Sequence, residues 1–241
     1  MRAIRLLLCL CSITMLSVPM SGCNSLRRKV ARKLGVRMKK HTIKIADLGP
    51  AYRKLKNGHN DFFNPAKKVT RKTGRRAIVI SYRTVGIPSL DVTLRDANLT
   101  FAQYRFADAI VSQIHKDLRK IFSLDFLKTN ERELRSAVKG RRISNMNMVK
   151  RLRRSKQTLA FLIPGMRDIA AKAGRLKASV GKLKTQGVAE LKRDPRRAIL
   201  APEMIKEAAT PTKRLYKVAR GAPGLITKLL RLQKVFSFLP L

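Results

Sequence analysis

One regular pattern constrains the fold of this chain more than any other. Between residues 90 and 122, a series of mostly apolar residues recurs at alternating steps of four and three. The series is Leu90, Leu94, Ala97, Phe101, Tyr104, Asp108, Val111, His115, Leu118 and Phe122. This spacing places its members on one face of a long α-helix. The sequence therefore predicts a mainly α fold with a helical bundle-like centre.

The ends of this helix can also be predicted. Ser89 can cap its start, and we expect the helix to end near Ser123. A competing interpretation makes residues 90–94 a short strand and starts the helix near Asn98. A second helix is predicted over residues 125–139.

Further helices are predicted on the C-terminal side, with prolines at their ends. Residues 146–163 have a helical pattern that we expect to end at Pro164, and residues 166–193 form a basic amphipathic helix. Because proline suits the first turn of a helix, we expect Pro202 and Pro211 to begin two short helices. The chain closes with an apolar stripe made of Leu225, Leu229, Leu232, Phe236 and Leu239.

The charge of the 241-residue chain, formally +41, is concentrated in two flanks. Residues 23–87 carry 19 Lys or Arg against two acids, and residues 136–241 carry 26 against five. Residues 88–135 between them carry eight against seven. Such a charge repels itself and makes sense beside a polyanion. We interpret the centre as the part that packs on itself and the flanks as the parts that meet the partner.

The first 23 residues, MRAIRLLLCLCSITMLSVPMSGC, have the layout of a secretory signal. Two arginines precede an apolar run, and a proline, small residues and a cysteine follow. The run is about 13 residues long, whereas a bilayer core needs about 20. The last four residues, Met20 to Cys23, resemble the lipobox of bacterial lipoproteins, although that family usually carries leucine in place of Met20.

The lipobox resemblance implies cleavage after Gly22 and attachment of the mature chain to a membrane through acyl chains, such as palmitate, on Cys23. By the same resemblance, Asn24 in place of aspartate favours the outer membrane. An ordinary secretory signal is one alternative. A mitochondrial transit peptide is another, since residues 1–40 lack acids, but the unbroken apolar run argues against it.

These patterns divide the chain into five segments. They are a signal peptide (1–22), a basic tether (23–40), a basic irregular segment with one or two short strands (41–87), a near-neutral helical core (88–140) and a basic helical region (141–241). The strand candidates are the alternation at Ile43 and Ile45 and the apolar run 77–80.

Basic residues of the tether and of the C-terminal region are the predicted polyanion-binding residues. They are Arg27, Arg28, Lys29, Arg32, Lys33, Arg153, Arg154, Arg175, Lys182, Lys228, Arg231 and Lys234. The helices at 166–193 and 225–239 could lie in a membrane interface, or pack their stripes into a bundle and present their charges to a polymer. The terminal helix has the larger apolar residues, which makes it the better membrane candidate.

Residues suited to catalysis or metal binding are not arranged convincingly in the sequence. Asp108, Ser112 and His115 have the types of a hydrolytic triad but project from one helix, so nothing converges on a substrate. We expect Asp108 and His115 to bond to a neighbouring helix instead. His59 and Asp61 lack further ligands at metal-binding spacing. We therefore expect no enzymatic activity and no cofactor.

The sequence thus favours a lipid-anchored protein of the bacterial envelope with a structural or binding role, whose basic helices contact anionic lipid or cell-surface polysaccharide. The alternative is a nucleic-acid-binding protein that uses non-specific phosphate contacts. Few aromatic residues interleave with the basic ones, which argues against base stacking.

Overall fold

The computed structural model of this protein describes residues 29–30, 38–58, 79–84, 86–139, 143, 145–193 and 198–239. The predicted signal peptide and Cys23 therefore lie outside the described residues, as do His59 and Asp61. Of the predicted tether residues, Lys29 is described and exposed. The other four lie outside the described residues: Arg27, Arg28, Arg32 and Lys33.

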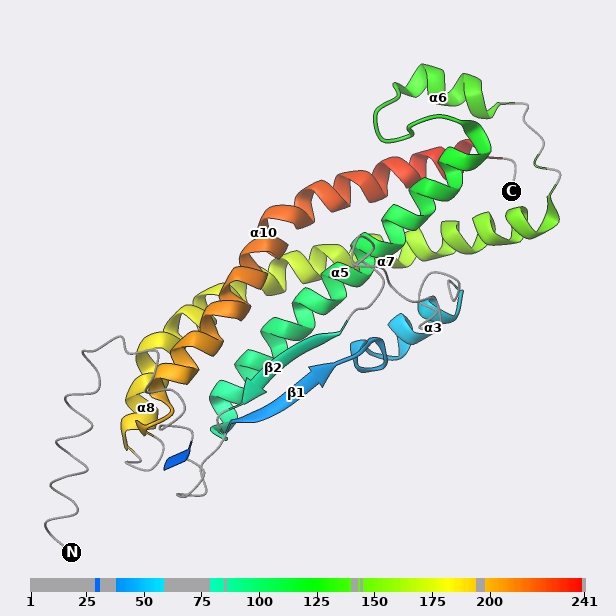
Figure 1. The fold of residues 1–241 in the computed structure, drawn as a ribbon. Coiled ribbons are helices and arrows are strands. Elements are labelled where there is room, and N and C mark those ends of the chain that lie inside the picture. Colours follow the sequence, from blue (N-terminus) through cyan, green and yellow to red (C-terminus); the bar gives the residue numbers. More distant parts are fainter. Residues whose placement is uncertain are drawn as a thin grey trace, which may run out of the picture.

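Three long helices form the body: α5 (Pro88–Phe122), α7 (Met146–Lys182) and α10 (Ala201–Phe238). Each of them packs against the other two. Figure 1 shows that α7 runs opposite to α5 and α10. The prediction of a mainly α fold with a bundle-like centre is confirmed.

All but one of the buried residues of α10 repeat at alternating steps of three and four, the exception being Val235. The repeating residues are Ala201, Met204, Ala208, Pro211, Leu215, Val218, Ala222, Leu225, Leu229, Leu232 and Phe236. A period of 3.5 residues keeps one seam of a helix turned toward its neighbours in a left-handed bundle. The predicted terminal stripe is thus part of the core, so it is not available as a membrane-facing surface.

Helix α5 is buried on more than the predicted face. Most of the predicted series is buried, and so are Phe106, Ile110 and Ile114, which are fully buried outside it. The reason is that α7, α10 and the sheet all pack on α5. The spacing of apolar residues along one face does not show that a helix has packing neighbours on several sides.

The start of α5 differs from the prediction, while its end agrees with it. Residues 90–94 are helical, so the strand interpretation is wrong. Ile87 is the N-cap residue and Ser89 does not cap the helix; the carboxylate of Asp91 instead accepts a hydrogen bond from the Gly86 amide at 2.9 Å. Ser123 ends the helix in the left-handed conformation, and its amide donates to the Arg119 carbonyl at 2.8 Å.

Two of the three predicted proline boundaries are wrong, because Pro164 does not end a helix and Pro211 does not begin one. Pro202 lies in the first turn of α10, as predicted, although that helix is long. Helix α7 continues through Pro164, and α10 contains both Pro211 and Pro223. A proline inside a helix removes one hydrogen bond and costs about 3 kcal/mol. The buried stripes continue on both sides of each proline, so burial outweighs that cost. Both helices change direction partway along (Figure 1), as helices with internal prolines do.

Two short strands, β1 (Lys39–Ile43) and β2 (Ile80–Thr84), form an antiparallel sheet. Lys39 lies opposite Thr84, and Ile43 lies opposite Ile80. The prediction of short strands in this part of the chain is confirmed, but their positions differ from it. Strand β1 begins inside the segment assigned to the tether and ends before Ile45, and β2 shares only Ile80 with the predicted run 77–80. Ile80, Tyr82 and Thr84 turn inward while their neighbours are exposed.

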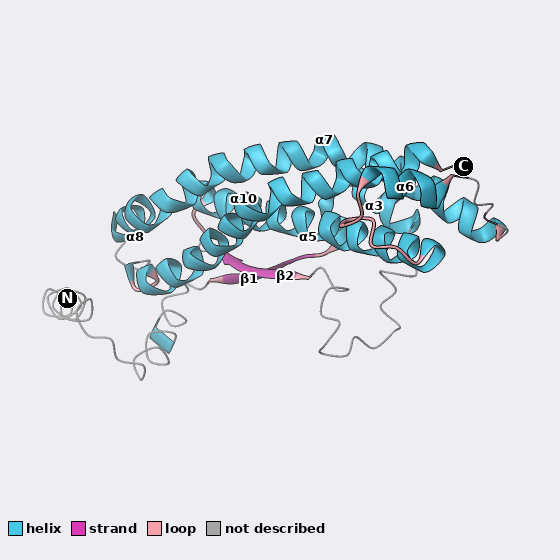
Figure 2. Ribbon diagram, turned by 90° about the horizontal axis from the view of Figure 1, so that it is seen from above, coloured by secondary structure: helices cyan, strands magenta, loops and turns pink. Residues whose placement is uncertain are grey.

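The sheet and a short helix cover two of the three grooves of the bundle. Figure 2 shows the sheet beside α5, on the side away from α7, and α10 holds it there: Glu207 accepts a hydrogen bond from the Arg83 amide at 2.9 Å. The 3-10 turn η1 (Ile45–Leu48) leads into α3 (Pro50–Gly58). From α3, Tyr52 packs edge-on against Phe106 of α5 and Phe161 of α7, with centroid distances of 5.4 and 5.9 Å.

The remaining helices are short. Helix α6 (Glu131–Val138) starts six residues later than predicted, because residues 125–129 form a turn in which the amides of Lys128 and Thr129 donate to the Asp125 carbonyl. Asn130 caps α6 by accepting from the Glu133 amide at 2.9 Å. A π-helical turn, η3 (Leu183–Gly187), joins α7 to α8 (Val188–Arg193).

Close packing of α10 on α5 depends on Gly221. A Cβ atom at this position would lie 2.2 Å from the Tyr104 hydroxyl oxygen, so Gly221→Ala should lower the free energy of unfolding by about 1–3 kcal/mol. The matched control is Gly224→Ala, where a Cβ atom meets nothing within 4 Å and should stabilise the helix by up to about 1 kcal/mol. Urea unfolding followed by far-UV circular dichroism measures both. Equal effects of the two substitutions would contradict this account of the contact.

Candidate functional site

Some of the basic residues are used inside the fold. Arg214 of α10 donates through Nη1 to the Asn98 side-chain oxygen and to the Ser81 carbonyl, the latter at 3.3 Å. Its guanidinium also lies 5.7 Å from the centroid of the Phe101 ring. Burial lowers the pKa of Arg214, while the charge of Glu207 opposes that shift. This cation joins α10, α5 and β2, so it is not free to bind a partner.

A second inward-facing cation is Arg151 of α7. Its Nε lies 2.8 Å from Oδ2 of Asp117 on α5, whose side chain is only 6% exposed. Gln113 donates to the other carboxylate oxygen at 2.8 Å. Burial raises the pKa of Asp117, and Arg151 and Gln113 partly offset this shift. The ion pair therefore links α5 to α7, but the pKa of Asp117 stays above its ordinary value.

The predicted bonds from Asp108 and His115 to a neighbouring helix take a different form. His115 bonds to Asp125 at 3.0 Å, so its partner lies in the turn after its own helix and not on a neighbouring helix. Burial tends to raise the pKa of Asp125, but the Leu127 amide and His115 hold it below the ordinary value. Asp108 is half-buried, and its charge, added to burial, raises the pKa of Tyr104.

Two predicted polyanion-binding residues hold α6 and the turn before it against α10. Arg231 donates through Nε to the Phe126 carbonyl at 2.8 Å and through Nη2 to the Thr129 carbonyl. Lys234 pairs with Glu131 at 2.5 Å, and this hydrogen bond lowers the pKa of the Glu131 carboxyl. Arg231 and Lys234 are thus engaged in intramolecular contacts.

The other predicted residues in the described part face outward. Arg153, Arg154, Arg175 and Lys182 are all exposed on α7, opposite its buried stripe, and Lys228 is exposed on α10. The structure brings the first four onto one long outer face but does not bring them into a compact cluster, since they span about eight turns of helix.

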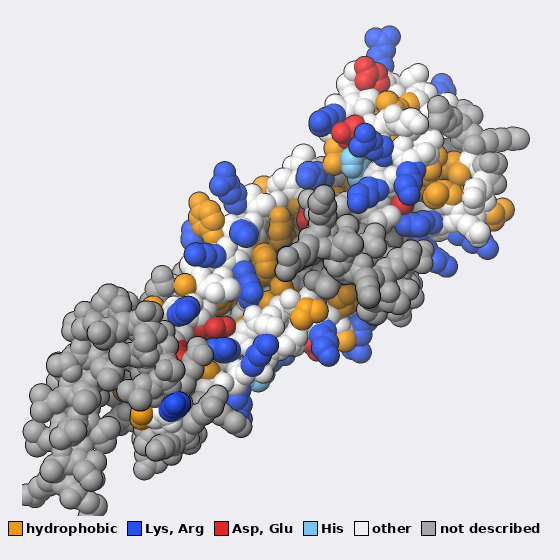
Figure 3. Space-filling model, in the orientation of Figure 1, with side chains coloured by type: hydrophobic (Ala, Val, Ile, Leu, Met, Phe, Trp, Pro, Cys, Tyr) orange, Lys and Arg blue, Asp and Glu red, His pale blue; other side chains and the backbone are white. Residues whose placement is uncertain are grey.

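The outward face of the bundle is strongly cationic. Helix α7 carries ten Lys or Arg against one acid, and α10 carries eight against two, whereas α5 carries five against four. Lys and Arg side chains are spread along the whole visible length of the molecule in Figure 3, with few acidic side chains among them.

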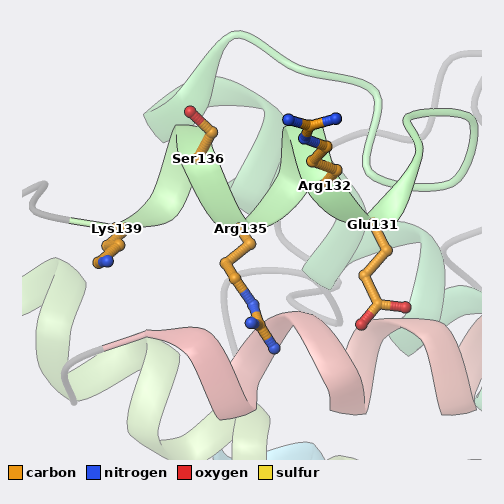
Figure 4. A pocket seen from close by; sticks show the side chains of 5 residues that line it. All are labelled: Glu131, Arg132, Arg135, Ser136 and Lys139. Atoms are coloured by element: carbon orange, nitrogen blue, oxygen red, sulfur yellow. The ribbon is translucent and has the colours of Figure 1, made fainter.

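A small hollow lies beside α6 and was not predicted from the sequence. Glu131, Arg132, Arg135, Ser136 and Lys139 line it. In Figure 4, Glu131 and Arg135 point toward α10, while Arg132 and Ser136 point away from it. Arg135 lies over the Phe238 ring, 5.1 Å from its centroid. The net charge of this part of the sequence is close to zero, so charge counting did not single out Arg132, Arg135 and Lys139.

Among the described residues, no group of three or more His, Cys, Asp or Glu side chains is placed to hold a metal ion. No described helix is long and apolar enough to cross a membrane. The chain matches none of the protein families, curated proteins or solved structures with which it was compared.

The Asp117–Arg151 pair predicts a pH-dependent effect on stability. Without Arg151 the buried carboxylate loses its countercharge, so the folded-state pKa of Asp117 should rise further above its unfolded value near 4. The stability lost in Arg151→Gln should then be about 2 kcal/mol at pH 7 and smaller at pH 4, where the carboxyl is increasingly protonated in both states. Urea unfolding at both pH values tests this.

The control for this prediction is Asp117→Asn, which removes the titrating group. In the Asp117→Asn background, the effect of Arg151→Gln on stability should change less between pH 4 and pH 7 than it does in the wild-type background. An Arg151→Gln effect of the same size at both pH values would show that Asp117 does not feel the guanidinium charge.

Proposed function

We propose that this chain is a lipid-anchored protein of the bacterial envelope whose cationic helical body binds anionic lipid head groups or cell-surface polysaccharide. Acyl chains on Cys23 would hold it to the membrane, and the outer membrane is the favoured location. The proposed role is structural or binding and not enzymatic. The anchor rests on the lipobox resemblance, and the binding role rests on the structure of the body.

One observation carries the binding role. Helices α7 and α10 bury their apolar stripes in the bundle, and this places most cations of α7 on its outer face. A helix whose apolar stripe is packed in the core cannot insert that stripe into a membrane unless the bundle unfolds. The outer face therefore meets its partner chiefly through charge, which fits a polyanion.

The charge distribution also fits a protein that acts by binding. The described acids are few, and several are already engaged: Asp117 with Arg151, Glu131 with Lys234 and Glu207 with the Arg83 amide. Most outer cations of α7 are left without an acidic neighbour on their own helix, since Asp168 is its only acid. Nucleic acid remains the alternative partner because phosphate would satisfy the same cations.

The α7 face can be tested by removing four of its charges. Combined Arg153→Gln, Arg154→Gln, Arg175→Gln and Lys182→Gln should weaken binding to a polyanion, and the slope of log K against log salt should fall by about 3. Titrations at several salt concentrations with anionic vesicles, an anionic polysaccharide and DNA would measure this.

A matched control removes the same charge elsewhere. Lys116, Arg119, Lys120 and Lys128 are exposed at the far end of α5 and in the turn after it, and changing all four to Gln should affect binding less. Equal losses in the two variants would mean that total charge, not the α7 face, governs binding. Tighter binding to DNA than to the other two polymers would favour the alternative.

The anchor can be tested separately. Cys23→Ser should remove the acyl chains, so the protein should leave the membrane fraction in about 1 M salt, where the Debye length is about 3 Å. The wild-type chain should remain, because acyl chains do not depend on charge. Intact-mass measurement checks the acylation, and an unmodified Cys23 in the wild-type chain would overturn the anchor.

A further inference from the structure

The groove between α7 and α10 carries an unusual row of exposed side chains. Large apolar residues that remain exposed are few in the described chain, and three of them lie on α10: Ile205 at 39%, Tyr216 at 55% and Leu230 at 41%. Pro223 is exposed as well. The sheet and α3 occupy the other two grooves, as described above.

These four residues lie along one side of α10. Tyr216 follows Ile205 by eleven residues, and Pro223 and Leu230 follow at steps of seven. Eleven residues make about three helical turns and seven make about two, so the side chains return to nearly the same direction. With a rise of 1.5 Å per residue, the row is about 37 Å long. The Lys177 ammonium of α7 lies 5.2 Å from the centroid of the Tyr216 ring, which places the row next to α7.

Cations flank this row on both sides. On α10 the exposed residues Lys213, Lys217, Arg220 and Lys228 lie on the side away from α7, and Lys177 lies on the α7 side. Residues three and four positions apart are neighbours on a helix surface, so Lys213 and Arg220 both adjoin Tyr216.

Two nearby acids, Glu207 and Asp168, face other grooves. Glu207 bonds to the Arg83 amide on the sheet side. Asp168 of α7 lies toward α3, where its charge, together with burial, raises the pKa of Tyr52 to about 12. The row of exposed apolar residues is therefore bordered by positive charge.

We propose that the groove between α7 and α10 docks on the surface of an anionic lipid bilayer, with Ile205, Tyr216, Pro223 and Leu230 entering the interface. This inference deepens the proposed function, because it names the lipid surface as the partner and assigns the face that meets it. The bundle would lie flat along the membrane to which Cys23 tethers it.

The chemistry of the groove fits a bilayer better than a soluble polymer. A tyrosine places its ring among apolar groups and its hydroxyl in water, which suits the head-group region. Lysine and arginine can extend their charges to lipid phosphates while their stems cover apolar surface. If the partner were a polymer bound by charge alone, the row of exposed apolar side chains, about 37 Å long, would have no role in binding.

The absence of tryptophan from this chain allows a site-specific test. The full acylated chain would be reconstituted into vesicles of phosphatidylcholine with phosphatidylglycerol brominated near the head group, using Tyr216→Trp as the reporter. The control reporter is Val92→Trp, since Val92 is 57% exposed on α5 and lies outside the row. We expect the Tyr216→Trp fluorescence to shift to shorter wavelength and to be quenched at least about threefold more than that of Val92→Trp.

Removing apolar contacts provides a second measurement. Ile205→Ser combined with Leu230→Ser should reduce quenching of the Tyr216→Trp reporter several-fold at unchanged net charge. The control is Met146→Ser, because Met146 is 66% exposed at the start of α7 and away from the row. Circular dichroism would establish that each variant is folded.

Several outcomes would overturn the proposal. One is equal quenching of the two reporters, and another is quenching that is the same when brominated phosphatidylcholine is the only lipid. A third is a larger spectral change of Tyr216→Trp with a soluble anionic polysaccharide or DNA than with vesicles. Acylated protein with an unquenched reporter would refute the groove and leave the anchor standing, whereas a quenched reporter on unacylated protein would refute the anchor and support the groove.

Discussion

Three long apolar seams, buried against one another, hold this molecule together. A chain with a formal charge of +41 repels itself, and the seams of α5, α7 and α10 offset that repulsion because they continue over whole helices. The 3.5-residue repeat of α10 keeps its seam inward from Ala201 to Phe236. Basic side chains consequently lie on the outside of the bundle or pair with specific groups inside it.

Three arginines did find such partners, and each joins parts of the chain distant in sequence. Arg151 connects α7 to α5, Arg214 connects α10 to α5 and β2, and Arg231 connects α10 to the turn before α6. A guanidinium suits these positions because its fixed donors can reach several oxygens at once. The fold thus uses part of its own positive charge to fix the arrangement of its helices.

The same packing gives the molecule distinct faces. The sheet is held in the groove between α5 and α10, and Tyr52 brings α3 into the groove between α5 and α7. The groove between α7 and α10 instead presents Tyr216 at 55% exposure beside Lys177. The proposed lipid surface and the outer cations of α7 are therefore consequences of which helix faces the bundle leaves uncovered.

Local spacing and composition were enough to predict the helical periods, the basic flanks and the apolar stripe at residues 225–239. The lipobox resemblance also rests on sequence alone. The packing of the whole chain places Pro164 and Pro211 inside helices, since a local penalty of about 3 kcal/mol is outweighed by burial summed along a helix. It also decided that Arg231 serves the fold while Arg153 faces solvent, because both have the same chemistry and differ only in what the packed chain brings near them.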